Sequence, residues 1–144
     1  MDYSKAADEA FEYLSKVNSF AVMKMVNDAS QGEQVVLGHL TFEQDGVTAG
    51  ELSGVFGLGS SRIAAILNAL TKKGLARRAS DPDDGRVVRV FVTDEGREKA
   101  IERKSLFKIR MVRMLEQLGE EDAKDFVRII EKIVKLGEMA DQDK

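Results

Sequence analysis

Apolar residues in the middle of the chain recur first at helical spacing and then at strand spacing. Within residues 60–73 the apolar positions lie three, four and seven residues apart, as in one buried face of a helix. They are Ile63, Ile66, Leu67 and Leu70. Residues 87–92 instead form a β-branched run with period-two alternation, which predicts a strand. A helix followed by a strand is therefore expected here.

Polar residues and glycines predict the helix boundaries before this strand. Residues 48–51, Thr-Ala-Gly-Glu, have the form of a capping box, in which the Thr hydroxyl and the Glu carboxylate satisfy free amides at a helix start. Gly57 and Gly59 should end that helix, because glycine readily adopts the conformations that terminate helices. The next helix is expected to open at Ser60 or Ser61.

A hairpin should follow the second helix. Gly74 is expected at the end of that helix, and residues 75–79 and 87–92 are expected to form two strands. The intervening segment, residues 80–86, contains Pro82 and an Asp-Gly pair, which favour a turn. Helix, turn, helix and a basic-tipped hairpin make a winged helix-turn-helix arrangement. The expected fold class is therefore mainly α with a small β wing.

The face of the second helix opposite its apolar stripe carries no acidic residue. Small side chains allow close approach to a DNA groove, while Asn and Arg can bond to base edges or phosphates. The composition favours DNA over the alternative, an ordinary solvated helix face, which would more often include Glu. The residues of this face are Ser61, Ala65, Asn68 and Lys72, with Arg62 and Ala69 beside them.

Apolar stripes on both sides of this region predict further helices, at residues 4–28, 34–42, 94–118 and 120–139. Ser4 is the expected cap of the first, and the last begins with acidic residues, as the helix dipole prefers. The stripes of the terminal helices are too large to be buried entirely on a winged domain of this size. The economical arrangement buries them against a second copy of the chain, and a monomeric helical subdomain is the alternative.

Several short motifs stand out along the chain. They are Gly32 to Leu40, Ser60-Ser61-Arg62, Lys73-Gly74-Leu75, Asp81-Pro82, Asp84-Gly85-Arg86 and Thr93-Asp94-Glu95-Gly96. These motifs resemble those of the DNA-binding domain in the MarR family of bacterial transcriptional regulators, and the resemblance continues into the flanking helices. The family's wing pattern, Asp-x-Arg, is matched by Asp84 and Arg86, whereas Gly85 stands where the family frequently has a basic residue.

The resemblance implies a winged helix-turn-helix DNA-binding domain at residues 33–93, flanked by dimerisation helices at residues 1–32 and 94–144. It implies a homodimeric regulator, expected to be a repressor, that binds an inverted-repeat operator in double-stranded DNA. The helix at residues 60–73 would enter the major groove, and the wing would reach into the neighbouring minor groove. The DNA contacts expected are Ser60, Ser61, Arg62, Ala65, Asn68, Lys72, Asp84 and Arg86.

Two further expectations concern partners. The family often binds small aromatic or phenolic compounds in the crevice between dimer helices and winged domain, so an effector of this kind is implied, with no residue of this chain assigned to it. A different class of function is a winged-helix module that binds protein instead of DNA. The basic residues Arg62 and Lys72, together with Asn68 and with Arg86 in the wing, favour DNA.

Charge is unevenly distributed along the chain. The 144 residues carry a formal net charge of -3. Residues 48–92 hold seven cations and four acids, a local charge of +3, which leaves -6 for the remainder. Because local charge sets the field at a phosphate backbone, an acidic protein can still carry a basic DNA-binding surface.

Composition narrows the possible chemistry. The absence of cysteine excludes disulfides, zinc-thiolate sites and thiol-based sensing. With His39 as the single histidine, we expect no metal site, no enzyme activity and no cofactor, and we expect His39 to pack or to lie at the surface. There is no apolar run of about 18 residues and no signal-peptide pattern, so a cytoplasmic location is expected.

Overall fold

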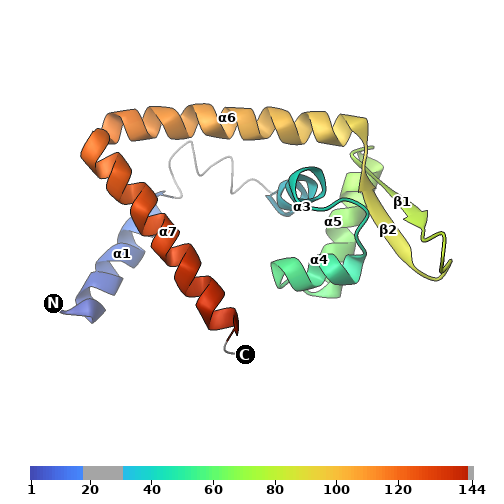
Figure 1. Ribbon diagram of the computed structural model, residues 1–144, viewed down its shortest axis with the longest axis horizontal. Coiled ribbons are helices and arrows are strands. Elements are labelled where there is room, and N and C mark those ends of the chain that lie inside the picture. The colour runs from blue at the N-terminus through green and yellow to red at the C-terminus, as the bar shows by residue number, and fades with distance from the viewer. Residues whose placement is uncertain (18–30, 143–144) are drawn as a thin grey trace. The chain divides into compact units, whose positions relative to one another are not determined.

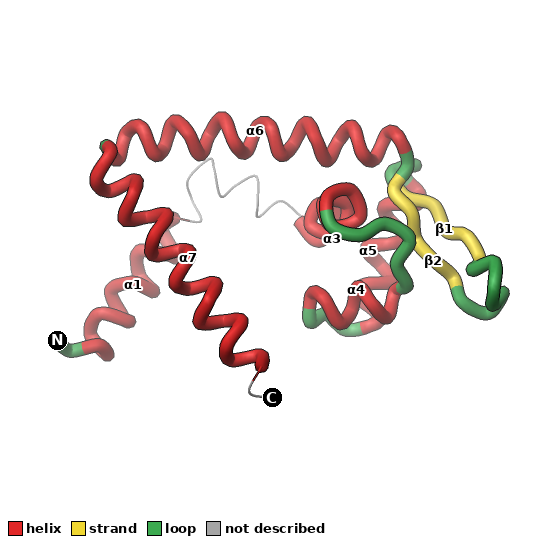
Figure 2. The backbone as a smooth tube through the Cα atoms, viewed as in Figure 1, coloured by secondary structure: helices red, strands yellow, loops and turns green. Residues whose placement is uncertain are grey.

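The computed structural model describes residues 1–17 and 31–142. It is mainly helical with one two-stranded antiparallel sheet, which confirms the predicted fold class (Figures 1 and 2). By its internal contacts the chain divides within one long helix, into Met1–Lys104 and Ser105–Lys144. The elements are α1 (Tyr3–Val17), α3 (Gln31–Phe42), α4 (Ala49–Phe56), α5 (Ser60–Lys72), β1 (Ala76–Ser80), β2 (Val88–Val92), α6 (Asp94–Leu118) and α7 (Glu120–Gln142).

One hydrophobic core holds α3, α4, α5 and the hairpin together. The predicted apolar face of α5 is buried, and so are the three α3 residues that face it. Burying each such aliphatic side chain contributes about 1.5–3 kcal/mol, so this core is the main reason for the arrangement. The buried aliphatic residues of these elements include Val36, Leu37 and Leu40 from α3, Leu52 from α4, Ile63, Ile66, Leu67 and Leu70 from α5, and Val90 and Val92 from β2.

The predicted capping box at the start of α4 is present. The Thr48 hydroxyl oxygen accepts from the Glu51 amide at 3.1 Å, and the Glu51 carboxylate accepts from the Thr48 amide at 3.2 Å. At the other end of α4, Gly57 has φ of 63°, a left-handed conformation that favours glycine. The turn then reaches Ser60, where α5 begins as expected.

The end of α5 explains why β1 starts one residue later than predicted. Gly74 has φ of 71°, and its amide donates to the Thr71 carbonyl at 3.0 Å. The Leu75 amide donates back to the Leu70 carbonyl at 2.9 Å, completing a Schellman motif. Because Leu75 still closes the helix, the strand begins at Ala76.

The hairpin, with its connecting residues 81–87, is called the wing below. Its register runs from Ala76 opposite Val92 to Ser80 opposite Val88. The predicted second strand began at Val87, but this residue closes the turn instead. Its amide donates to the Asp84 carbonyl at 3.0 Å, and its carbonyl accepts from the Asp81 amide at 2.8 Å.

A tight joint connects the wing to α6. The Thr93 hydroxyl donates to the Gly74 carbonyl at 2.7 Å and accepts from the Gly96 amide at 3.1 Å, so Thr93 caps α6 while holding the end of α5. A Cβ on residue 96 would lie 2.0 Å from the Leu75 carbonyl oxygen. Only glycine fits this close approach.

The first two described helices begin earlier than expected. The Asp2 carboxylate accepts from the Ser4 and Lys5 amides at 3.0 and 3.1 Å, so Asp2 caps α1 and the prediction of Ser4 was wrong. Residues 18–28 of that predicted helix lie outside the described residues. Helix α3 starts at Gln31, where Glu33 places a carboxylate in the first turn.

The last two helices meet at Gly119, which has φ of 84° and ends α6 as predicted. Helix α7 opens with three acidic residues, also as predicted. None of its residues is buried by the described part of the chain. Its apolar stripe includes Val127, Ile130, Ile133 and Val134, which are 44–62% exposed. In the described ranges, no helix is long and apolar enough to cross a membrane.

Candidate nucleic-acid interface

Helix α5 separates its apolar residues from the predicted DNA contacts. Ile63, Leu67 and Leu70 are at most 1% exposed, whereas the residues expected to meet DNA lie on the solvent side. There is no acid in the first turn of the helix. The exposed set consists of Ser60, Ser61, Arg62, Ala65, Asn68 and Lys72, so the structure brings these residues together on one helix.

Asn68 has a partner that the sequence did not indicate. Nη2 of Arg78 donates to Oδ1 of Asn68 at 2.9 Å. Strand alternation offers the missed signal, because side chains two residues apart share a sheet face and Ala76 faces the core. Arg78 therefore lies on the sheet face directed at α5, within reach of Asn68.

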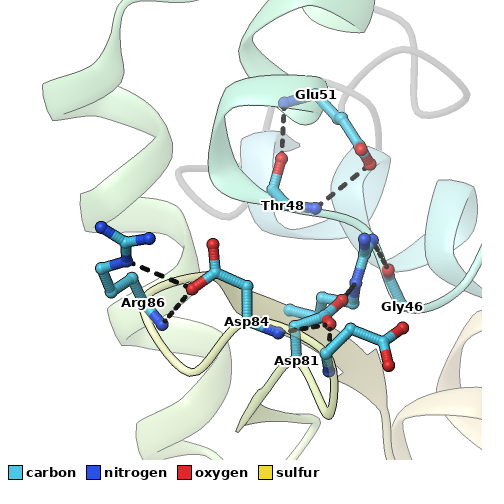
Figure 3. A network of polar contacts seen from close by, with 8 residues as sticks. Gly46, Thr48, Glu51, Asp81, Asp84 and Arg86 are labelled. Atoms are coloured by element: carbon cyan, nitrogen blue, oxygen red, sulfur yellow. Dashed lines mark hydrogen bonds and ion pairs between the residues drawn. The ribbon is translucent and has the colours of Figure 1, made fainter.

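Asp81 organises the turn of the wing (Figure 3). Its Oδ1 accepts from the Asp83 and Asp84 amides at 2.8 and 3.2 Å. Its Oδ2 lies 2.5 Å from Nε of Arg89, whose Nη1 donates to the Gly46 carbonyl at 3.0 Å. The hydrogen bond from Arg89, followed by that from the Asp83 amide, holds the pKa of Asp81 below its ordinary value. Arg89 is thus a structural cation of the wing.

Asp84 and Arg86, the two residues of the Asp-x-Arg pattern, are in contact at the tip of the wing (Figure 3). Oδ1 of Asp84 accepts from the Arg86 amide at 3.1 Å and lies 3.3 Å from Nε of Arg86. The Arg86 side chain is 93% exposed. A surface pair of this kind contributes little to stability, but it directs an otherwise free guanidinium outward from the turn.

The cations of the winged domain include a first group that contacts other side chains and a second group without an ion-pair partner in the described residues. Lys73 pairs with Glu33 at 2.6 Å, and Arg77 lies over the Phe91 ring with its guanidinium 4.6 Å from the ring centroid. Arg62 and Lys72 have no ion-pair partner among residues 1–17 and 31–142, and both are exposed on α5. The second group adds positive charge to the exposed face of the helix without neutralising acids.

His39 is half-buried in the winged domain. Its ring lies edge-on to Phe56, with centroids 5.5 Å apart and an interplanar angle of 78°. The contact agrees with the expectation that His39 packs or lies at the surface. The described part of the chain contains no group of three His, Cys, Asp or Glu side chains that could hold a metal ion.

Comparisons with known proteins agree with this geometry. Residues 35–87 match the family model of the MarR family, which confirms the resemblance over the winged domain. A search of curated proteins finds no match.

Solved structures extend the likeness to the whole fold. Streptococcus pneumoniae FabT in complex with DNA has a TM-score of 0.74 and 17% identity, covering 96% of this chain and 99% of that one. A MarR transcriptional regulator from Methanosarcina mazei has a TM-score of 0.72 and 19% identity, covering 94% and 99%. MepR, which regulates the Staphylococcus aureus multidrug efflux pump MepA, has a TM-score of 0.66 and 19% identity, covering 94% and 98%.

Proposed function

Because residues 35–87 match the family model of the MarR family, we propose that the protein is a sequence-specific, double-stranded-DNA-binding transcriptional regulator. The observation that carries the proposal is the division of α5. Its apolar face is buried in the core, and its exposed face offers hydroxyl, amide and basic groups without an acid. Such a face can approach the negatively charged edge of a duplex at no cost in like-charge repulsion.

The two parts of the surface have different roles in this proposal. Helix α5 lies in the major groove, where each base pair presents a distinct pattern of donors and acceptors. Ser61, Arg62 and Asn68 provide groups that can bond to base edges or phosphates there. Ser60, Ala65 and Lys72 complete the contact surface. Arg86, directed by Asp84, enters the adjacent minor groove, which is more negative where it is narrow.

The dimer is the second component of the proposal. The apolar stripe of α7 is exposed in the single chain, and leaving such a stripe in water forgoes its hydrophobic stabilisation. We assign residues 1–32 and 94–144 to dimerisation and residues 33–93 to DNA binding. A two-fold dimer presents two copies of α5, which suits an inverted-repeat operator.

The proposal also includes repression of transcription and release from DNA by a small-molecule effector. A dimer bound across an operator would block access to the promoter. A small aromatic compound that binds only one arrangement of the two winged domains would shift the population between DNA-binding and non-binding dimers. The support for these two points is the family resemblance alone. No enzymatic role is part of the proposal.

The alternative is a winged-helix module that binds protein. An electrophoretic shift with DNA from the promoter of the protein's own operon distinguishes the two. The proposal predicts a discrete complex that unlabelled specific DNA displaces and unrelated DNA of the same length does not. No complex at low salt would favour the protein-binding module, whereas equal displacement by both DNAs would contradict sequence-specific binding.

A further inference from the structure

The pairing of Asn68 with Arg78 bears on how α5 would read bases. Asn68 lies on the exposed face of the helix, and Arg78 reaches it from β1. Nη2 of Arg78 donates to Oδ1 of Asn68 at 2.9 Å. The neighbouring Arg77 lies on the other sheet face, over the Phe91 ring. Of the two adjacent arginines, Arg78 is therefore the one that contacts the exposed face of α5.

The contact determines which way round the Asn68 amide lies. A guanidinium carries five N–H donors and no acceptor, so only the amide oxygen can face it. The amide nitrogen, with its two donors, is then the end that Arg78 leaves available. An asparagine on a helix surface without such a partner can turn either end toward DNA.

The orientation changes which bases fit. An unconstrained asparagine suits adenine, because its oxygen accepts from N6 while its nitrogen donates to N7. Arg78 occupies one of the two lone pairs of the Asn68 oxygen and turns that oxygen toward itself. The amide then presents its nitrogen to a base, where the N6 amino group of adenine would meet another donor. The acceptors O6 and N7 of guanine, or O4 of thymine, match the available end.

We propose that Arg78 is a specificity-determining positioning residue, which orients the Asn68 amide so that α5 reads a guanine or thymine acceptor instead of adenine. The inference rests on the proposed DNA-binding function. A competing role for Arg78 is a direct phosphate contact, which would add affinity without base preference. Removal of the guanidinium distinguishes the two roles. Loss of a positioning residue changes which base is preferred at the Asn68 position, whereas loss of a phosphate contact does not.

The test is selection from a pool of random DNA duplexes with the full chain, followed by affinity measurements on duplexes that differ at single positions. Four variants accompany the parent: Arg78→Ala, Arg78→Lys, Asn68→Ala and the Arg78→Ala, Asn68→Ala double variant. The position read by Asn68 is the one whose preference Asn68→Ala abolishes. Thermal unfolding of each variant checks that the fold is retained.

The parent should prefer guanine or thymine over adenine at that position by about fivefold or more. Arg78→Ala should erase or reverse this preference, because the freed amide can pair with adenine. Arg78→Lys keeps a donor for the amide oxygen and should retain the parental profile. In the Asn68→Ala background, Arg78→Ala should cause no further change in the profile.

Three results would overturn the inference. The first is a parental preference for adenine at the Asn68 position, or no position that depends on Asn68. The second is an Arg78→Ala variant that binds all sequences more weakly with an unchanged profile, as a phosphate contact predicts. The third is the absence of any enriched sequence with the parent protein. That result would contradict the proposed function itself, whereas the first two results are compatible with sequence-specific DNA binding.

Discussion

Oδ2 of Asp81 lies 2.5 Å from Nε of Arg89. Nη1 of Arg89 also donates a hydrogen bond to the carbonyl of Gly46, which lies 43 residues earlier in the chain. Val47, the next residue, pairs with Val90 of β2 through a 2.7 Å hydrogen bond. The turn that carries Arg86 is therefore fastened to the segment preceding α4. A wing held at this base can present its tip in a defined direction.

Asp81→Asn tests whether the Asp81–Arg89 contact stabilises the wing. Asparagine can still accept from the Asp83 and Asp84 amides, so the substitution removes mainly the charge that binds Arg89. We expect a lower melting temperature and weaker DNA binding at neutral pH. Asp83→Asn is the matched control, because it removes the same charge from an exposed neighbour that makes no ion pair with the described residues.

The same pair predicts a pH dependence. The pKa of Asp81 is lowered in the folded protein, so its stabilisation is complete above the unfolded carboxyl pKa of about 3.9 and is lost as pH falls through the folded value. The melting-temperature difference between parent and Asp81→Asn should thus be constant near neutrality and shrink at acidic pH below about 4. A difference that grows on acidification would contradict the assignment.

Salt dependence measures how many cations meet phosphates. If each subunit places about three to four cations on the backbone, log affinity should fall against log salt with a slope of roughly -5 to -7 per dimer. Lys72→Ala should make this slope shallower by about 2, one contact from each subunit. Lys135→Ala, on the exposed surface of α7, should leave it unchanged. A nearly flat slope for the parent would argue for a protein partner.

Arg86 tests the wing. Arg86→Ala should weaken operator binding by about 1–3 kcal/mol and reduce the preference for A·T-rich flanks, while the preferred core sequence stays the same. Asp84→Asn should cause a smaller loss, since it removes the charge that directs the guanidinium but keeps Arg86. Binding of Arg86→Ala as tight as that of the parent at moderate salt would remove the wing from the interface.

A substitution in the apolar stripe of α7 tests whether this stripe lies at a dimer interface. Ile133 is 62% exposed in the single chain, so in a monomer Ile133→Glu should be nearly neutral. At a dimer interface the buried charge should instead lower the dimer fraction measured by light scattering. Lys135→Gln on the opposite side of α7 makes the same change in charge and should not affect it. A parent protein that is monomeric at micromolar concentration would contradict the assignment.

Local interactions made much of the fold predictable from the sequence. The capping box of Thr48 and Glu51 and the apolar face of α5 depend on residues within about two helical turns. The Asp84–Arg86 contact is also local, and the Asp-x-Arg pattern had pointed to these two residues. Predictions based on adjacent residues therefore hold best where the structure itself is stabilised locally.

Contacts between distant elements could not be predicted in this way. Arg89 was counted as one cation among several, yet Asp81 and Gly46 engage it. Asn68 was expected to be free for bases, yet Arg78 holds its oxygen. The contacts with Gly46 and Asn68 depend on how β1 and β2 pack against other elements. Strand alternation places Arg78 on the sheet face directed at α5, but it does not specify which side chain of α5 Arg78 meets. The predicted DNA contacts are brought together on α5 and the wing, and their binding roles stay predictions.

The most direct test of the account is a footprint of the full-length protein on its selected duplex. The proposed dimer predicts two protected half-sites related by a two-fold axis, with centres about one helical turn, ~10 base pairs, apart on one face of the DNA. Duplexes carrying one half-site should bind far more weakly than those carrying both. Protection without sequence preference, or equal affinity for an isolated half-site, would contradict a homodimeric, sequence-specific regulator.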